Sequence, residues 1–322
     1  MSKAPRHTNK LLVTAAVLAA TALIVRQQAR KAERDNPPVG RFLDIDGVRL
    51  HYVERGQGRP LVLLHGNGSL IQDFAVSGLI DLAASRYRVI AFDRPGYGYS
   101  DRPRNIRWTP EAQAALLHQA LQQLGVERPI VVGHSWGTLV ALALALDYPA
   151  DVESLVLLSG YYFPTARLDV ALLSPPALPI LGDILRYTVS PLLSALLWPG
   201  IRRKLFTPAA VPAHFEAFPV RMLLRPWQLR ASAEESALMI PAAKTLSRRY
   251  GELTLPVMIM AGADDQIADV GRQSMRLHQE LPQSELRLVP GVGHMVHQNV
   301  PDQVMAAIDA AANAGLPAAR FS

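Results

Sequence analysis

Short apolar runs alternate with helical segments over most of this chain, beginning near residue 41. The apolar runs lie at residues 60–65, 88–92, 129–132, 152–158, 256–260 and 285–289, and helical stretches at 111–124, 139–146 and 270–281. Strands that are apolar along their whole length are buried on both faces, and strands separated by helices pair in parallel. The pattern predicts an α/β fold with a mostly parallel sheet, preceded by a hairpin over residues 41–53.

Length and composition limit how this fold can be organised. A chain of 322 residues, 49% of them hydrophobic, can bury one large core. We expect a catalytic core at residues 41–160 and 251–322, interrupted by a helical lid at residues 161–250, because that interval is too long for a loop. The lid is rich in proline and leucine and has short helical patches at 191–198 and 220–225. It favours an apolar pocket and a lipophilic small-molecule substrate.

The N-terminal segment is apolar from Leu11 to Val25, with Lys10 before it and Arg26 after it. A helix of fifteen residues covers about 22 Å, which is short for a hydrocarbon core of about 30 Å, although flanking cations can extend towards the headgroups. We expect residues 1–40 to form a single membrane-anchor helix and a linker. Its orientation stays open because the flanking charges are balanced. A cleaved signal, giving a secreted or periplasmic protein, is the alternative.

Charge and cysteine content exclude several functions. The net charge of +6 lies largely beside the N-terminal apolar segment and in the lid, so we expect no nucleic-acid partner. The absence of cysteine excludes disulfides, thiolate metal sites and cysteine nucleophiles. We expect neither a metal nor a cofactor, since no dinucleotide loop, phosphate loop or metal-ligand motif is visible. Oligomeric state cannot be predicted.

The motif Gly-His-Ser-Trp-Gly at residues 133–137 stands between an apolar run and a helix. Its two glycines permit a tight strand-to-helix turn, which would expose Ser135 as a nucleophile. The loop His-Gly-Asn-Gly at residues 65–68 follows another strand, where an oxyanion hole is needed. We therefore predict the backbone amides of Asn67 and Trp136 as the two oxyanion donors. His65 itself is expected to be structural.

A serine nucleophile needs a base and an acid, which we expect late in the chain. His294 lies in a glycine-rich loop after the last strand, whereas His278 lies inside a predicted helix and His297 is expected to orient or cap its segment. His294 is therefore the predicted base. The loop after residues 256–260 offers Asp264, Asp265 and Asp269 as acids. These residues alone do not rank Asp264 against Asp265.

Taken in order, five motifs resemble the α/β-hydrolase superfamily, in its lid-bearing serine-esterase and epoxide-hydrolase-like branch. They are residues 65–68, Asp-Arg-Pro-Gly-Tyr-Gly-Tyr-Ser at 93–100, residues 133–137, Gly-Ala-Asp-Asp at 262–265, and Gly-His-x-x-His at 293–297. The similarity covers about residues 41–312. In that family the second acidic position of the Gly-x-Asp-Asp pattern usually carries the triad acid. The resemblance thus implies Asp265, with Asp264 as the alternative.

Epoxide hydrolases of similar pattern carry aspartate where this chain has Ser135. An aspartate that attacks an alkyl carbon gives an ester that water can reopen, whereas serine would give a stable ether. Ser135 therefore favours acyl transfer, with a lipophilic carboxylic ester as the expected substrate. Carbon–carbon, amide or peptide, and perhydrolase chemistry with the same triad are alternatives. A non-catalytic binding protein on the same fold is a further alternative.

Overall fold

The computed structural model describes residues 6–166, 170 and 174–314, and an eight-stranded sheet forms its centre. Its strand order is β1-β2-β4-β3-β5-β6-β7-β8. The strands are β1 (Arg41–Ile45), β2 (Val48–Arg55), β3 (Arg59–Leu64), β4 (Tyr87–Phe92), β5 (Ile130–His134), β6 (Ser154–Leu158), β7 (Val257–Gly262) and β8 (Ser284–Val289). β2 pairs antiparallel with β1 and β4, and the other pairings are parallel. The predicted sheet and its leading hairpin are confirmed.

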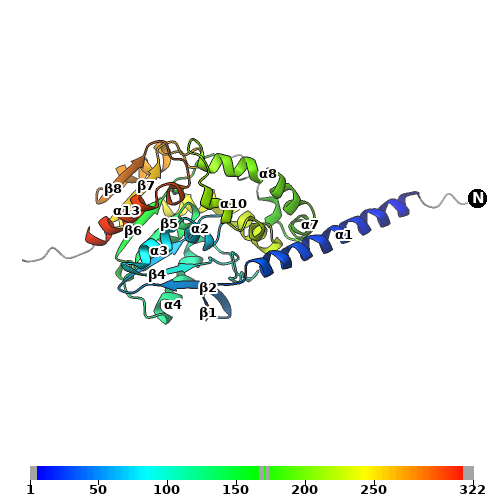
Figure 1. Ribbon diagram of the computed structural model, residues 1–322, viewed down its shortest axis with the longest axis horizontal. Helices are drawn as coiled ribbons and strands as arrows, with labels where there is room; N and C mark the ends of the chain where they lie inside the picture. The colour runs from blue at the N-terminus through cyan, green and yellow to red at the C-terminus, as the bar shows by residue number, and fades with distance from the viewer. Residues whose placement is uncertain (1–5, 167–169, 171–173, 315–322) are drawn as a thin grey trace, which may run out of the picture.

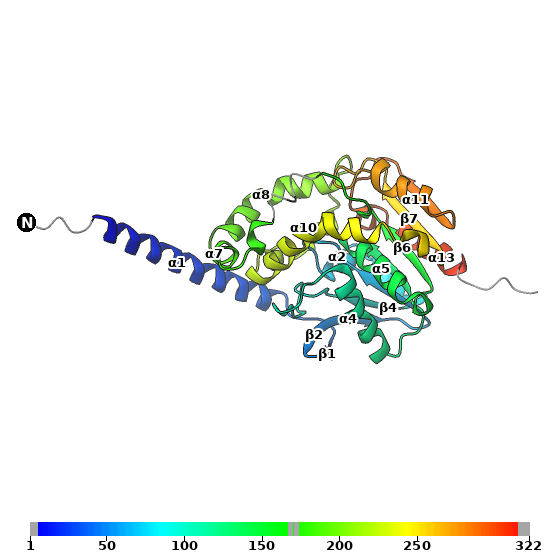
Figure 2. The ribbon, with the colours of Figure 1, turned by 180° about the vertical axis from the view of Figure 1, so that it is seen from behind.

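Helices cover both faces of this sheet. One face carries α2 (Gln72–Val76), α3 (Leu79–Ala84), α12 (Val296–Asn299) and α13 (Pro301–Ala314), and the other carries α4 (Pro110–Gln123), α5 (Trp136–Asp147) and α11 (Arg276–Glu280). Figure 1 shows α3 and α13 in front of the sheet, and Figure 2 shows α4 and α5 on the opposite side. In β5, Val131 packs into one core and Val132 into the other. Because successive side chains of a strand point to opposite faces of the sheet, an apolar core forms on each face.

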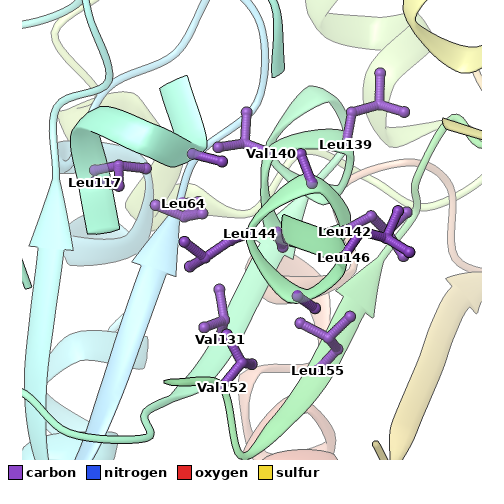
Figure 3. Close-up of a cluster of buried hydrophobic side chains, with 14 of the residues drawn as sticks. Leu64, Leu117, Val131, Leu139, Val140, Leu142, Leu144, Leu146, Val152 and Leu155 are labelled. Carbon is purple, nitrogen blue, oxygen red and sulfur yellow. The ribbon is translucent and has the colours of Figure 1, made fainter. Parts of the chain in front are cut away.

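Helix α5 is buried along nearly its whole length, from Trp136 to Leu146. Its leucine, valine and alanine side chains contact strands β5 and β6 on one side and Leu117 of α4 on another, as Figure 3 shows. A helix that is apolar all round is stable only where it is enclosed on every side. This packing fixes the position of the turn that precedes α5, where Ser135 lies.

Between β6 and β7, the described part of residues 161–250 contains several α-helices. They are α7 (Leu181–Tyr187), α8 (Val189–Phe206), α9 (Val220–Leu223) and α10 (Pro226–Leu246). The predicted patches at 191–198 and 220–225 fall in α8 and α9, but α10 was not predicted. Pro226 at the first helical position suits its start. The helix predicted at residues 270–281 instead begins with a π-helical turn, Gly271–Met275, before α11.

Helix α1 (Arg6–Asp35) projects away from the sheet, as both views show. Its C-terminal part is buried against the rest of the molecule through Val25, Ala29 and Ala32, whereas the side chains of residues 13–20 are exposed. Glu33 adds an ion pair to Arg225, with 3.0 Å between Glu33 Oε1 and Arg225 Nη1. Within the segment predicted to form an anchor helix and a linker, the residues up to Asp35 thus continue helix α1, and they dock it on the rest of the molecule.

The membrane anchor predicted from Leu11 to Val25 is not supported. This apolar run is part of the 30-residue helix α1, and the side chains of Leu11 and Leu12 lie outside the described residues. In the part of the chain that the structure describes, no helix combines the length and apolar character needed to cross a bilayer.

Candidate active site

Ser135 lies in a strained turn between β5 and α5. Its φ of 52° is in the left-handed region, which a residue with a side chain rarely adopts. The Ser135 amide donates to Leu158 O at the end of β6 (2.9 Å), and the Thr138 amide donates to Ser135 O (3.0 Å). A Cβ on Gly133 would lie 2.6 Å from Gly137 O, so the turn requires glycine there. These contacts hold Ser135 at the carboxyl edge of the sheet.

The loop after β3 lies directly against Ser135. A Cβ on Gly66 would come within 3.1 Å of Ser135 Cβ. No hydrogen bond found among the described residues uses the backbone amide of Asn67 or of Trp136. Trp136 is the first residue of α5, where amides lack helical partners and the helix dipole is positive. Both predicted oxyanion donors are thus unoccupied amides in the segments that flank Ser135.

His294 and Asp265 are brought together from the loops after β8 and β7. His294 Nδ1 lies 2.7 Å from Asp265 Oδ2, and both side chains are buried. The other carboxylate oxygen, Oδ1, accepts the amides of Ile267 (2.7 Å) and Ala268 (3.0 Å). This arrangement orients the carboxylate towards Nδ1 and leaves Nε2 as the remaining nitrogen of the imidazole.

Asp264, the alternative acid, has a different environment. Its Oδ2 accepts the amide of Gly291 at 2.9 Å, and its side chain is exposed. This contact closes the turn after β8 instead of touching His294. Asp269 accepts the amide of Arg272 at the start of the π-helical turn. Of the three candidates, Asp265 is the one that faces the histidine.

The loops of Ser135 and His294 meet through His134. The His134 and His294 ring centroids are 5.0 Å apart, and His134 Nε2 lies 3.2 Å from His294 O. Over the described residues, the hydrogen bonds include none between the Ser135 hydroxyl and His294. Such contacts are often long before substrate binds. His278 lies elsewhere, in α11, with its Nδ1 2.8 Å from Ser284 Oγ.

A second buried cluster lies beside this site, and its members were not grouped together from the sequence. Asp73, His134 and His297 have ligand atoms within 4.8 Å of one another, so they could hold a metal ion. His297 Nε2 is 3.1 Å from Asp73 Oδ1, and the Asp73 oxygens also accept from Ser69 and Gln298. Burial alone would raise the pKa of Asp73, but the adjacent His297 holds it well below its usual range. His297 therefore contacts a carboxylate that sequence reasoning did not pair with it.

His65 is fully buried and has a structural role, as predicted. Its Nδ1 donates to Gly66 O (2.8 Å), and its Nε2 accepts the amide of Arg94 (3.0 Å). This pair of contacts fits the neutral imidazole. Burial and the nearby Arg94 cation lower the pKa of His65 to about 4. The ring thus stays uncharged at neutral pH and fixes the start of the loop that is predicted to form the oxyanion hole.

This lowered pKa predicts acid sensitivity. Between pH about 6.5 and about 4 the unfolded chain binds a proton at His65 that the folded chain does not, so the free energy of unfolding falls as the pH falls. The contribution of His65 is about 3 kcal/mol across this window. Urea unfolding at several pH values should give a shallower dependence for His65→Gln. An unchanged slope would contradict the assignment.

The model of one protein family matches most of the chain. It is described as the alpha/beta hydrolase fold and matches residues 59–299. Among curated proteins, haloalkane dehalogenase 2 of Mycobacterium bovis is 27% identical over 281 residues, which cover 84% of this chain and 94% of that protein. The 2-hydroxy-6-oxo-2,4-heptadienoate hydrolase of Pseudomonas putida is 28% identical over 265 residues, with 81% and 91% covered.

A solved structure with similar architecture is Cfl2 from Burkholderia cenocepacia. The TM-score is 0.68 at 24% sequence identity, and the match covers 84% of this chain and 94% of that one. At this level of identity the likeness shows the fold alone.

Proposed function

This chain belongs to the alpha/beta hydrolase fold family, and on that premise we propose that it is a serine hydrolase of a lipophilic carboxylic ester. The observation that carries the proposal is the 2.7 Å contact between His294 and Asp265, in loops that meet the strained turn of Ser135. Nucleophile, base and acid with two free amides form the set that acyl transfer requires.

In this mechanism, Ser135 Oγ attacks the substrate carbonyl while His294 Nε2 takes its proton. Asp265 holds the imidazole in the required tautomer and stabilises its charged form. The amides of Asn67 and Trp136 bind the oxyanion. His294 then gives the proton to the departing alcohol, the acyl group stays on Ser135, and water activated by His294 releases the acid.

The names of the two curated relatives describe different reactions, dehalogenation of a haloalkane and hydrolysis of a dienoate. A serine that displaced halide from an alkyl carbon would form an ether that water does not reopen, so Ser135 disfavours that reaction. Carbon–carbon bond hydrolysis is the second candidate, because it can use the same acyl-enzyme and the heptadienoate hydrolase matches 81% of this chain. Amide or peptide hydrolysis and perhydrolysis remain further alternatives.

We propose that residues 161–250 form a lid, because their apolar side chains pack against both catalytic loops. One core cluster contains Leu70, which follows the oxyanion loop, and Met295, which follows His294. The residues of the insertion in the same cluster are Phe206, Phe215, Phe218 and Met222. Apolar walls over a nucleophile favour an apolar acyl or alcohol group.

A fluorophosphonate probe and an ester panel test this function. The purified protein should label at Ser135 and hydrolyse medium-chain p-nitrophenyl esters faster than a vinylogous diketone or an aminoacyl anilide. Failure to label would support a non-catalytic binding protein. Faster turnover of the diketone would support carbon–carbon bond hydrolysis instead.

We further propose that this protein contacts a lipid surface through α1, α7 and α8. Large exposed apolar side chains concentrate on these helices and at the N-cap of α7: Val13, Val17, Leu18, Leu23, Ile24, Ile180, Leu181, Ile184, Val189, Leu192, Leu193, Leu196, Leu197 and Ile201. Residues of α1 and α8 line one cavity, so the two helices are neighbours. Exposed Lys10, Arg26, Arg203 and Lys204 add positive charge, and α8 contains no acidic residue. Apolar and basic surface together suits anionic lipid.

Co-sedimentation with phosphatidylglycerol vesicles tests this contact. Leu192 and Leu196 share one face of α8, so the double variant Leu192→Asp and Leu196→Asp should lower the bound fraction about fivefold or more. Leu82→Asp, at an exposed position of helix α3 in the core, is the matched control and should bind like wild type. Equal binding of all three proteins would exclude α8 from the contact.

A further inference from the structure

The guanidinium of Arg94 is fully buried and binds the oxyanion loop directly. Its Nε donates to His65 O (2.7 Å), and its Nη2 donates to Gly66 O (2.9 Å). These are consecutive carbonyl groups immediately before Asn67. A planar guanidinium that binds both carbonyls fixes the orientation of both peptide planes.

The second of these carbonyls determines where the oxyanion donor points. Gly66 C=O and Asn67 N–H belong to the same planar trans peptide, so they point in opposite directions. When Arg94 holds Gly66 O on one side of the loop, the Asn67 amide is directed to the other side. The proposed donor is thus oriented by a cation that never touches the substrate.

The anion that holds Arg94 comes from the insertion. Glu235 of α10 is fully buried, with its Oε1 2.5 Å from Arg94 Nη1 and its Oε2 3.0 Å from Arg94 Nη2. The Tyr97 hydroxyl lies 2.7 Å from Glu235 Oε2 and 2.8 Å from Asn67 Oδ1. Gln113 completes the network, because its Nε2 donates to Glu235 Oε1 at 3.0 Å.

Helix α10 also binds the loop at a second point. The side-chain amide of Asn67 donates to Ser232 O (3.2 Å) and Ser236 Oγ (3.1 Å), both on α10. Asn67 is therefore held by α10 through its side chain, and its peptide is held by α10 through Arg94. A displacement of α10 would disturb both contacts together.

We propose that Glu235 is a positioning residue that assembles the oxyanion hole when α10 docks on the core. The inference rests on the proposed function, since it assigns the Asn67 amide to the oxyanion. A buried ion pair contributes little net stability, because desolvation of both charges offsets their attraction. What the ion pair contributes is orientation, because it holds the Arg94 guanidinium in one position against the carbonyl oxygens of His65 and Gly66. Docking of the insertion on the core and assembly of the proposed oxyanion donors then occur together.

The chain offers a matched pair of variants, Glu235→Gln and Glu234→Gln. Glu234 is adjacent on α10 and also pairs with a core arginine, with its Oε2 2.7 Å from Arg102 Nε. Arg102 has no described contact with the oxyanion loop. Glutamine keeps the size of either side chain but removes its charge.

For Glu235→Gln we expect kcat on a chromogenic ester to fall about 10- to 100-fold with KM changed less than about threefold, since oxyanion donors act mainly in the transition state. Glu234→Gln should keep kcat within about twofold. Tyr97→Phe removes one hydroxyl from the same network without burying an unpaired charge, and should lower kcat about three- to tenfold. Circular dichroism and thermal melting establish that each variant is folded.

Three outcomes overturn the inference. They are wild-type kcat in folded Glu235→Gln, an increase in KM alone, or equal loss in both glutamate variants. If Glu235→Gln does not fold, wild-type kcat in Tyr97→Phe has the same meaning. Failure of the wild-type protein to label with fluorophosphonate would instead refute the proposed function, so the two failures are distinguishable.

Discussion

Ser135→Ala is expected to lower kcat for ester hydrolysis by roughly 10⁵- to 10⁶-fold and to abolish fluorophosphonate labelling. The loss is large because alanine leaves no atom that can form the acyl-enzyme, while His294 and Asp265 stay in contact. The residual rate would come from the oxyanion amides and substrate binding alone. Hydrolysis of a p-nitrophenyl ester under saturating substrate measures the change.

Ser159→Ala is a closely matched control for this variant. Ser159 follows β6 as Ser135 follows β5, and its φ of 46° is also left-handed. Its amide donates to Met260 O at 2.8 Å, and its buried hydroxyl has no partner among the described residues. We expect Ser159→Ala to label and to keep kcat within about threefold. If Ser159→Ala lost as much of kcat as Ser135→Ala, the loss would come from disruption of the turn and not from removal of a nucleophile.

The predicted elements agree with the structure where a buried apolar run marked them. The hairpin predicted over residues 41–53 corresponds to β1 and β2, and β5, β7 and β8 were predicted within two residues at either end. Helix α10 was missed because its polar and apolar residues follow no clear stripe and Pro241 lies inside it. That helix carries Glu235, which pairs with Arg94, and its residues Ser232 and Ser236 contact Asn67 of the loop predicted to form the oxyanion hole.

The candidate nucleophile and base could be found from sequence because each lies in a short glycine-containing motif. The residues alone did not identify the partner of His294, since Asp264 and Asp265 are adjacent and chemically identical, and only the family resemblance implied Asp265. What separates them is backbone geometry: the amides of Ile267 and Ala268 hold one carboxylate, and the amide of Gly291 holds the other. The pairing of Arg94 with Glu235 spans 141 residues and has no local signal.

The prediction of an N-terminal membrane anchor was limited because the sequence does not show how the helix packs against the domain. Apolar length suggested an anchor from Leu11 to Val25, but composition did not show that Val25, Ala29 and Ala32 dock on the domain. The helix continues to Asp35 and docks by its C-terminal part, which leaves apolar side chains from Val13 to Ile24 exposed, as are apolar side chains of α7 and α8. Contact with a lipid surface is therefore proposed for three helices together.

Asp265→Asn is the second variant with a large expected effect, a loss of about 10⁴-fold in kcat at neutral pH. The backbone amides of Ile267 and Ala268 require an oxygen at the Oδ1 position, so the new NH₂ group must take the Oδ2 position, 2.7 Å from His294 Nδ1. That NH₂ donates, which forces Nδ1 to accept and places the imidazole proton on Nε2. An Nε2 that already carries a proton cannot take one from Ser135.

Asp264→Asn is the matched control, because it makes the same chemical change one residue earlier. The substituted side chain would still offer an oxygen to the amide of Gly291, which Asp264 now binds at 2.9 Å. We expect kcat within about twofold of wild type and unchanged thermal stability. The comparison isolates tautomer control from loop structure, since both aspartates bind backbone amides but only Asp265 also contacts His294. A larger loss for Asp264→Asn than for Asp265→Asn would assign the acid to Asp264 and contradict the proposed triad.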